Sequence, residues 1–230
     1  MSYTQLAVTQ IISLVSSLLP IIFFISFCTK THIKGFWVIF LYSIASLLSD
    51  FFISSNWGSL HQYLLWNLYT IVEYSILSFF FYLIIKIRLI RTLIIITSAI
   101  YFIVFFMLIK GITLQFNSVL SSFSQVIILG LCLIYLFSSM KHSVETINLI
   151  NPMFLIVVAL LLYVAFTLFL FVIANNLSAK EMAEYWGNIT IYNNILTNLL
   201  FSTAFLLYRF QYKSSTPENQ TVDFTSPNDR

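Results

Sequence analysis

Two acidic residues, Glu73 and Asp50, lie within long apolar stretches of this chain, where a charged group is costly. Wound as a helix, segment 66–74 places Tyr69 one turn from Glu73, and the Glu73 side chain leans towards the Tyr69 hydroxyl. Asn67 belongs to the same segment, and Asp50 shares a stripe of about 80° with serines of its own stretch. Carboxylate, hydroxyl and amide oxygens bind cations, and carboxyl groups also exchange protons, so these four residues are candidate ligand- or ion-binding residues.

Two asparagines from the last apolar stretch join this set. Asn194 and Asn198 share an arc of about 100° with Thr197 on a helical wheel. At a rise of about 1.5 Å per residue, we expect Asn198 at the depth of Glu73 and Asn194 at the depth of Asp50. Polar stripes at matched depths predict an outward-facing polar pocket between the second, third and seventh helices.

The chemistry open to Glu73 depends on its charge. No lysine or arginine lies deep in the apolar stretches, and an isolated carboxylate in a low dielectric takes up a proton. Glu73 is therefore a neutral hydrogen-bonded acid, a group in a water-filled cavity or a ligand for a cation. The structural alternative is that Glu73, Asn194 and Asn198 join helices through hydrogen bonds worth about 1 kcal/mol or less each.

The sequence lacks the residues that several other activities require. A retinal pigment needs a lysine in mid-helix, and no apolar stretch has one. A metal-dependent hydrolase needs several ligands that converge on one point. The one combination that could do so is His61 with Glu181 and Glu184, and the alternative is that these three are ordinary surface residues. The sequence has no glycine-rich phosphate loop, no Cys-x-x-Cys and no nucleophile elbow. We assign no catalytic residue, no metal ligand and no cofactor.

The composition identifies an integral membrane protein. Hydrophobic residues make up 60% of the 230 residues and charged residues 8%, with a mean hydropathy of +0.94. Soluble domains are about 45–50% apolar and about 25% charged. The net charge of +3 is too small for a nucleic-acid interface. Cys28 and Cys132 are no disulfide framework, and we expect both to remain thiols.

Seven continuous apolar runs of about twenty residues predict an all-α, polytopic bundle of seven transmembrane helices. The predicted spans are approximately 6–28, 36–54, 64–85, 92–109, 119–140, 153–174 and 189–210. They form one transmembrane domain over 1–210, followed by a disordered cytoplasmic tail over 211–230. The runs 92–109 and 153–174 carry few polar residues, so we expect both helices to face lipid.

The basic residues predict the orientation. Nine of them fall on one side of the predicted membrane and two, Lys110 and Lys180, on the other. Cytoplasmic loops are enriched in lysine and arginine, so we expect the N-terminus outside and the C-terminus in the cytoplasm. Ser178 and Glu181 have capping-box spacing, which predicts a short helix on the outer surface within 175–187, with a solvated loop as the alternative.

The whole pattern resembles small uncharacterised seven-helix bacterial inner-membrane proteins. The resemblance rests on Asn67, Tyr69 and Glu73 in the third helix and on the asparagine-rich seventh helix. It implies this topology and a location in the bacterial inner membrane, and it implies no activity and no catalytic residue.

Three functions fit these observations. The preferred hypothesis is a non-enzymatic membrane module, a sensor with receptor-like topology, that senses a ligand or binds a partner through the outward-facing pocket. The first alternative is a proton- or cation-coupled transporter or channel that uses Glu73. The second is an intramembrane lipid-modifying enzyme with Asp50, Glu73 and His61 as acid–base groups. The expected partners are the lipid bilayer, a small-molecule or ion ligand, and a membrane or cytoplasmic protein.

Overall fold

Apolar helices make up the regular structure of the chain. The computed structural model describes residues 3–29, 31, 33–54, 59–112, 118–142, 151–174 and 179–215, with side chains for 11–29, 31, 33–52, 64–107, 119–140, 151–170 and 189–211. The helices within these ranges are α1 (Tyr3–Phe27), α2 (Lys34–Ser54), α3 (Ser59–Ile84), α4 (Arg88–Ile112), α5 (Ser118–His142), α6 (Pro152–Ala174) and α7 (Ala179–Ser215). The all-α prediction is confirmed.

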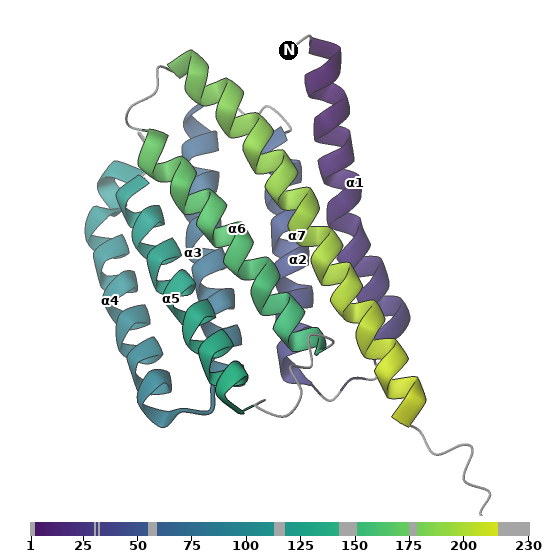
Figure 1. The fold of residues 1–230 in the computed structure, drawn as a ribbon. Coiled ribbons are helices and arrows are strands. Elements are labelled where there is room, and N and C mark those ends of the chain that lie inside the picture. Colours follow the sequence, from purple (N-terminus) through teal and green to yellow (C-terminus); the bar gives the residue numbers. More distant parts are fainter. Residues whose placement is uncertain are drawn as a thin grey trace, which may run out of the picture.

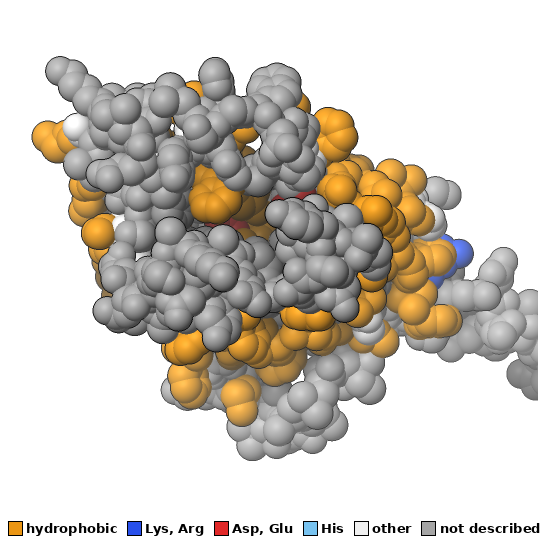
Figure 2. Space-filling view, turned by 90° about the horizontal axis from the view of Figure 1, so that it is seen from above, with side chains coloured by type: hydrophobic (Ala, Val, Ile, Leu, Met, Phe, Trp, Pro, Cys, Tyr) orange, Lys and Arg blue, Asp and Glu red, His pale blue; other side chains and the backbone are white. Residues whose placement is uncertain are grey.

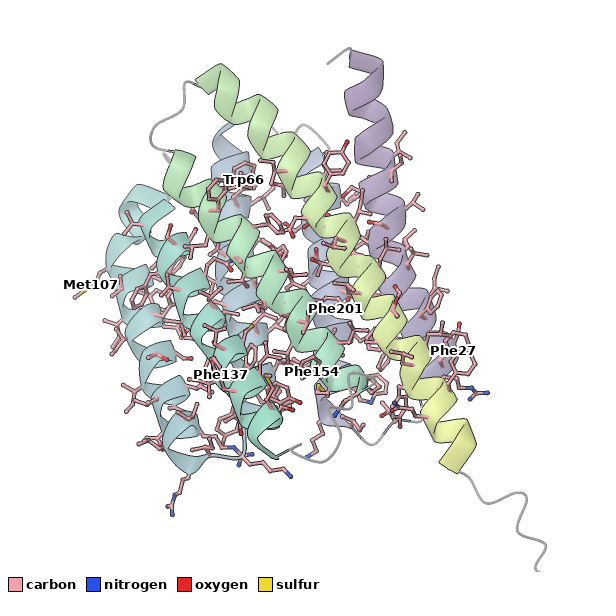
Figure 3. The ribbon with its side chains drawn as sticks, in the orientation of Figure 1. Phe27, Trp66, Met107, Phe137, Phe154 and Phe201 are labelled. Atoms are coloured by element: carbon pink, nitrogen blue, oxygen red, sulfur yellow. The ribbon has the colours of Figure 1, made fainter. Side chains whose placement is uncertain are left out.

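Five helical segments in the described ranges are long and apolar enough to cross a membrane, since about twenty apolar residues span about 30 Å of hydrocarbon. These segments are Lys34–Phe52, Leu64–Ile84, Arg88–Met107, Val119–Met140 and Pro152–Leu170. In α1 the described apolar part, Ile11–Phe27, is shorter. Large hydrophobic side chains are also exposed around the bundle, as Met107 on α4 illustrates (Figure 3). These features are those of a multi-pass membrane protein.

The helices run up and down in turn and pack in two layers (Figure 1). α5, α6 and α7 lie side by side in front of α3 and α2, while α4 and α1 lie at opposite edges (Figure 1). α1 packs along α7, and α3 packs against both α2 and α5. Because the number of helices is odd, α1 begins at one end of the bundle and α7 finishes at the other.

The two helices expected to face lipid differ. On α4, most large apolar side chains are exposed, which confirms the expectation for residues 92–109. The expectation for 153–174 is wrong, because α6 lies between α5 and α7 and buries five residues completely. They are Ile156, Val157, Ala159, Leu160 and Val164. A helix that is apolar on every side fits a protein interior as well as lipid, so its composition alone does not distinguish the two.

α7 begins about ten residues before the predicted span. Its first described residue is Ala179, and the predicted cap, Ser178, lies outside the described residues. The helix then continues without interruption to Ser215, so the expected separate surface helix is instead the first part of α7. The first five residues of the predicted disordered tail, 211–215, belong instead to α7, and the rest of the tail, from 216 onwards, lies outside the described residues.

The bundle is divided along its length into a polar half and an aromatic half. Towards the end where α7 begins, the buried residues include many polar ones, such as Ser17, Glu73, Gln125 and Asn198. Towards the other end, the core is aromatic and packed ring against ring, with close contacts among Phe24, Phe36, Phe40 and Phe205. Both cysteines are buried free thiols, as expected.

Two helical glycines test this packing. A Cβ atom at Gly35 of α2 would lie 2.9 Å from Met153 Cε and 3.3 Å from Ile84 Cγ2, whereas a Cβ at Gly130 would meet no atom within 4 Å. We therefore expect Gly35→Val to destabilise the protein by about 1–3 kcal/mol. The matched change Gly130→Ala should be neutral or stabilising by up to about 1 kcal/mol, because alanine favours the helix. Thermal unfolding in detergent measures both, and equal melting of Gly35→Val and wild type would contradict the contact.

Candidate functional site

Glu73 lies near the middle of the membrane-spanning part of α3. It follows Leu64, the first residue of the apolar segment, by nine residues, which corresponds to about 14 Å along the helix axis. Its side chain is only 5% exposed and faces the interior of the bundle. A carboxyl group at this depth requires hydrogen-bond donors from the protein itself.

Three neutral side chains from three other helices meet the Glu73 carboxyl group. The Tyr42 hydroxyl of α2 donates to Oε1 at 3.1 Å, and Nε2 of Gln125 on α5 donates to Oε2 at 3.1 Å. Tyr163 of α6 is a third hydrogen-bonding partner. We call these four residues the Glu73 cluster. Within the described part of the chain, no lysine or arginine contributes to it.

A line of polar groups leads from the Glu73 cluster towards the end of the bundle where α7 begins. Tyr69 is hydrogen-bonded to Tyr42 and to Ser46, and it lies close enough to both Glu73 and Asp50 to interact with their charges. Ser46 precedes Asp50 by one helical turn on α2. In Figure 2, which views the molecule from that end, acidic atoms are visible in the middle of the face. Among residues with described side chains, the acidic ones are Asp50 and Glu73.

Asp50 and Asn198 meet at a different place, the contact of α1 with α2 and α7. Asp50 is hydrogen-bonded to Ser17. Nδ2 of Asn198 donates to the hydroxyls of Ser16 and Ser17, each at 3.2 Å. The sequence had placed Asn198 level with Glu73, whereas these hydrogen bonds join it to the serine that also contacts Asp50.

The other predicted site residues are placed as follows. Asn67 is buried on α3 and Tyr69 is half-buried. Asn194 is half-buried, and its neighbour Asn193 is the buried residue, donating from Nδ2 to the Tyr163 carbonyl at 3.0 Å. The hydrogen-bond partners of Glu73 thus come from α2, α5 and α6. α7 is connected to them by the hydrogen bond from Asn193 to the backbone carbonyl of Tyr163. The predicted pocket instead combined the second, third and seventh helices.

Sequence reasoning assigned no site role to Tyr42 or Tyr163. Tyr42, Ser46 and Asp50 are spaced by four residues, so they follow one face of α2, and this spacing was an available signal for Tyr42. Tyr163 had no comparable signal, since it lies in the most apolar helix of the chain. Gln125 was visible as a polar residue in its span, but nothing in the sequence paired it with Glu73.

The one combination of residues considered for a metal ion lies outside the described side chains; it consists of His61, Glu181 and Glu184. Within the described residues, no group of three or more histidine, cysteine, aspartate or glutamate side chains is arranged to hold a metal ion. Comparison of the chain with protein families, with curated proteins and with solved structures gives no match.

The Glu73 cluster predicts a contrast between two substitutions. Glu73→Leu removes the acceptor and leaves two hydroxyls and an amide buried without it, so the apparent melting temperature should fall by about 5 °C or more. Glu73→Gln keeps the shape and can still accept hydrogen bonds, so its melting should stay within about 2 °C of wild type. Thermal unfolding in one detergent compares them, and equal melting of the two variants would show that the cluster does not support the bundle.

Proposed function

We propose that this chain is a non-enzymatic membrane module that senses protons, with Glu73 as the residue that takes up and releases the proton. The observation that carries the proposal is the set of partners around Glu73, which are all neutral and come from three other helices. A carboxyl group with no cationic partner in a low dielectric changes its charge more readily than one held in an ion pair.

The size of the site favours a proton over an organic ligand. Tyr42, Glu73, Gln125 and Tyr163 are each at most 8% exposed, so their side chains leave little accessible surface for a larger molecule. Each partner can also reverse its role. A tyrosine hydroxyl donates or accepts, and the Gln125 amide offers either NH₂ or its oxygen. Oε1 of Gln125 is buried without a hydrogen-bond partner among the described residues, so an amide flip could present it to a protonated Glu73.

The two halves of the bundle support access from one side. The polar line through Tyr69 connects the Glu73 cluster with the end where α7 begins. Below the cluster, Phe80, Phe81, Phe36 and Phe205 are at most 1% exposed, and they fill the aromatic half. A group reached from one side and closed off from the other suits a sensor better than an open channel.

The proposal includes the orientation expected from the basic residues. The lysines and arginines with described side chains lie in the aromatic half, where nitrogen atoms are seen in Figure 3; they are Lys34, Lys86, Arg88, Arg91 and Arg209. By the positive-inside rule this half is cytoplasmic, with the N-terminus and the polar half outside. The location that we propose is the bacterial inner membrane, which rests on the resemblance stated above.

Infrared difference spectroscopy on the protein in nanodiscs tests the proton-binding role. Between high and low pH, we expect a carbonyl band of a buried protonated carboxyl group in wild type. Glu73→Gln should lose that band, because the amide cannot take up the proton. The matched control Asp50→Asn should keep it. Identical carboxyl bands in wild type and Glu73→Gln over the whole pH range would remove Glu73 from the proposed function.

A second candidate, proton- or cation-coupled transport, is favoured by the line of groups from Asp50 through Tyr69 and Tyr42 to Glu73. Transport would need the aromatic half to open, whereas sensing would not. The line supplies one half of a path, so transport requires a second conformation.

Proton flux into proteoliposomes separates sensing from transport. If the chain is a sensor, wild type and Glu73→Gln should show the same background flux. If it transports protons, wild type should exceed background, and Glu73→Gln should abolish the excess. Tyr69→Phe, which removes one hydroxyl from the line, should then lower the flux by about tenfold or more. Flux above background that survives Glu73→Gln would contradict a transport role for this residue.

A further inference from the structure

Asp50 has its own polar surroundings, apart from the Glu73 cluster, in a seam between α1, α2 and α7. The seam consists of Asp50, Ser13, Ser16, Ser17 and Asn198. The hydroxyls of Ser16 and Ser17 lie 2.7 and 3.1 Å from the Ser13 carbonyl oxygen and donate to it. The Asn198 amide NH₂ group donates to both serine hydroxyls, and Asp50 is hydrogen-bonded to Ser17.

The seam has too few hydrogen-bond donors to stabilise the ionised form of Asp50. Ser17 has one hydroxyl proton, which the Ser13 carbonyl and Asp50 share. The Asn198 amide protons already point to the serine oxygens. Oδ2 of Asp50 is buried and has no hydrogen-bond partner among the described residues. A buried carboxylate oxygen without a hydrogen-bond donor is costly, so this oxygen needs a proton or a cation beside it.

No basic side chain of the same helix can supply that charge. Lys34 begins α2, sixteen residues before Asp50, which corresponds to about 24 Å along the helix. The other lysines and arginines with described side chains lie in the aromatic half as well. Glu73, the other acid with a described side chain, shares the neighbour Tyr69 with Asp50, and it can add only negative charge to this region.

We propose that this seam binds a monovalent alkali cation of the sodium class between Asp50, Ser17 and Asn198. The ligand atoms would all be oxygens, namely the Asp50 carboxylate, the Ser17 hydroxyl and the Asn198 amide oxygen, and hard cations prefer such ligands. The Asn198 oxygen reaches the seam when the amide group, whose nitrogen here donates to the two serines, is turned over. Protein sites for divalent cations usually combine more than one carboxylate, whereas the seam offers one negative charge, which a monovalent ion balances. The site uses none of the residues of the Glu73 cluster and does not require the proposed function.

Thermal unfolding of the full chain in detergent tests the site. Sodium, potassium and choline chloride are compared at equal ionic strength. We expect sodium to raise the melting temperature by about 3 °C or more over choline, because an ion that binds the folded state stabilises it. Radioactive sodium should bind at one ion per chain. Asp50→Asn should abolish both the sodium-dependent shift and the bound ion, while the control Glu73→Gln should keep them.

The readout is the difference between salts, since Asp50→Asn can change absolute stability by removing a buried charge. Ser17→Ala provides a second variant, which keeps the carboxylate and should weaken sodium binding by about tenfold. Equal melting in sodium and choline would overturn the site and indicate that a proton alone neutralises Asp50. A sodium effect that persists in both variants would also overturn it. Because Glu73→Gln keeps the sodium effect, loss of the Glu73 infrared band would not affect this result.

Discussion

The requirement that a carboxyl group in mid-membrane receive hydrogen bonds from its own protein organises this bundle. Glu73 on α3 draws its partners from α2, α5 and α6, so four helices must keep their relative height for one side chain. Tyr163 extends the constraint, because its hydroxyl bonds to Glu73 while its carbonyl accepts from Asn193 of α7. The position of α6, apolar on every side and yet buried, follows from these two contacts together with its packing.

The parts of the fold that the bilayer itself dictates were predictable from the sequence. Hydrocarbon thickness fixes the length of an apolar run, so the ends of the helices were predicted to within about five residues, apart from the start of α7. Depth follows from counting residues, which placed Glu73 near mid-membrane. The lipid-facing position of α4 followed from its lack of polar residues. The same argument failed for α6, because apolar surfaces fit lipid and protein interior equally.

The partners of Glu73 were harder to predict because tyrosine combines an apolar ring with a polar hydroxyl group. Hydropathy counts Tyr42 and Tyr163 as apolar, and their rings do pack against each other edge to face at 6.4 Å, but their hydroxyls are the polar groups of the site. For α7, the sequence prediction separates the segment 175–187, which ends at Gly187, from the last span. Glycine is tolerated within membrane helices, and here the helix continues through it. Long-range pairings such as Asn198 with Ser16 and Ser17 leave no trace in a single sequence.

The two carboxyl groups differ in the number of hydrogen-bond partners that the protein provides. Glu73 has three partners that can each donate or accept, whereas Asp50 shares one hydroxyl proton and has a buried oxygen with no partner among the described residues. Tyr69 lies close enough to both groups to be affected by their charges, so the two carboxyl groups belong to one low-dielectric region, where like charges oppose each other. A cation held at Asp50 would therefore favour the ionised form of Glu73. By reciprocity, release of the proton from Glu73 would strengthen cation binding at Asp50, because the coupling free energy between two sites is the same from either side. Two carboxyl groups in one low-dielectric region would in this way make the proposed proton-binding residue responsive to salt.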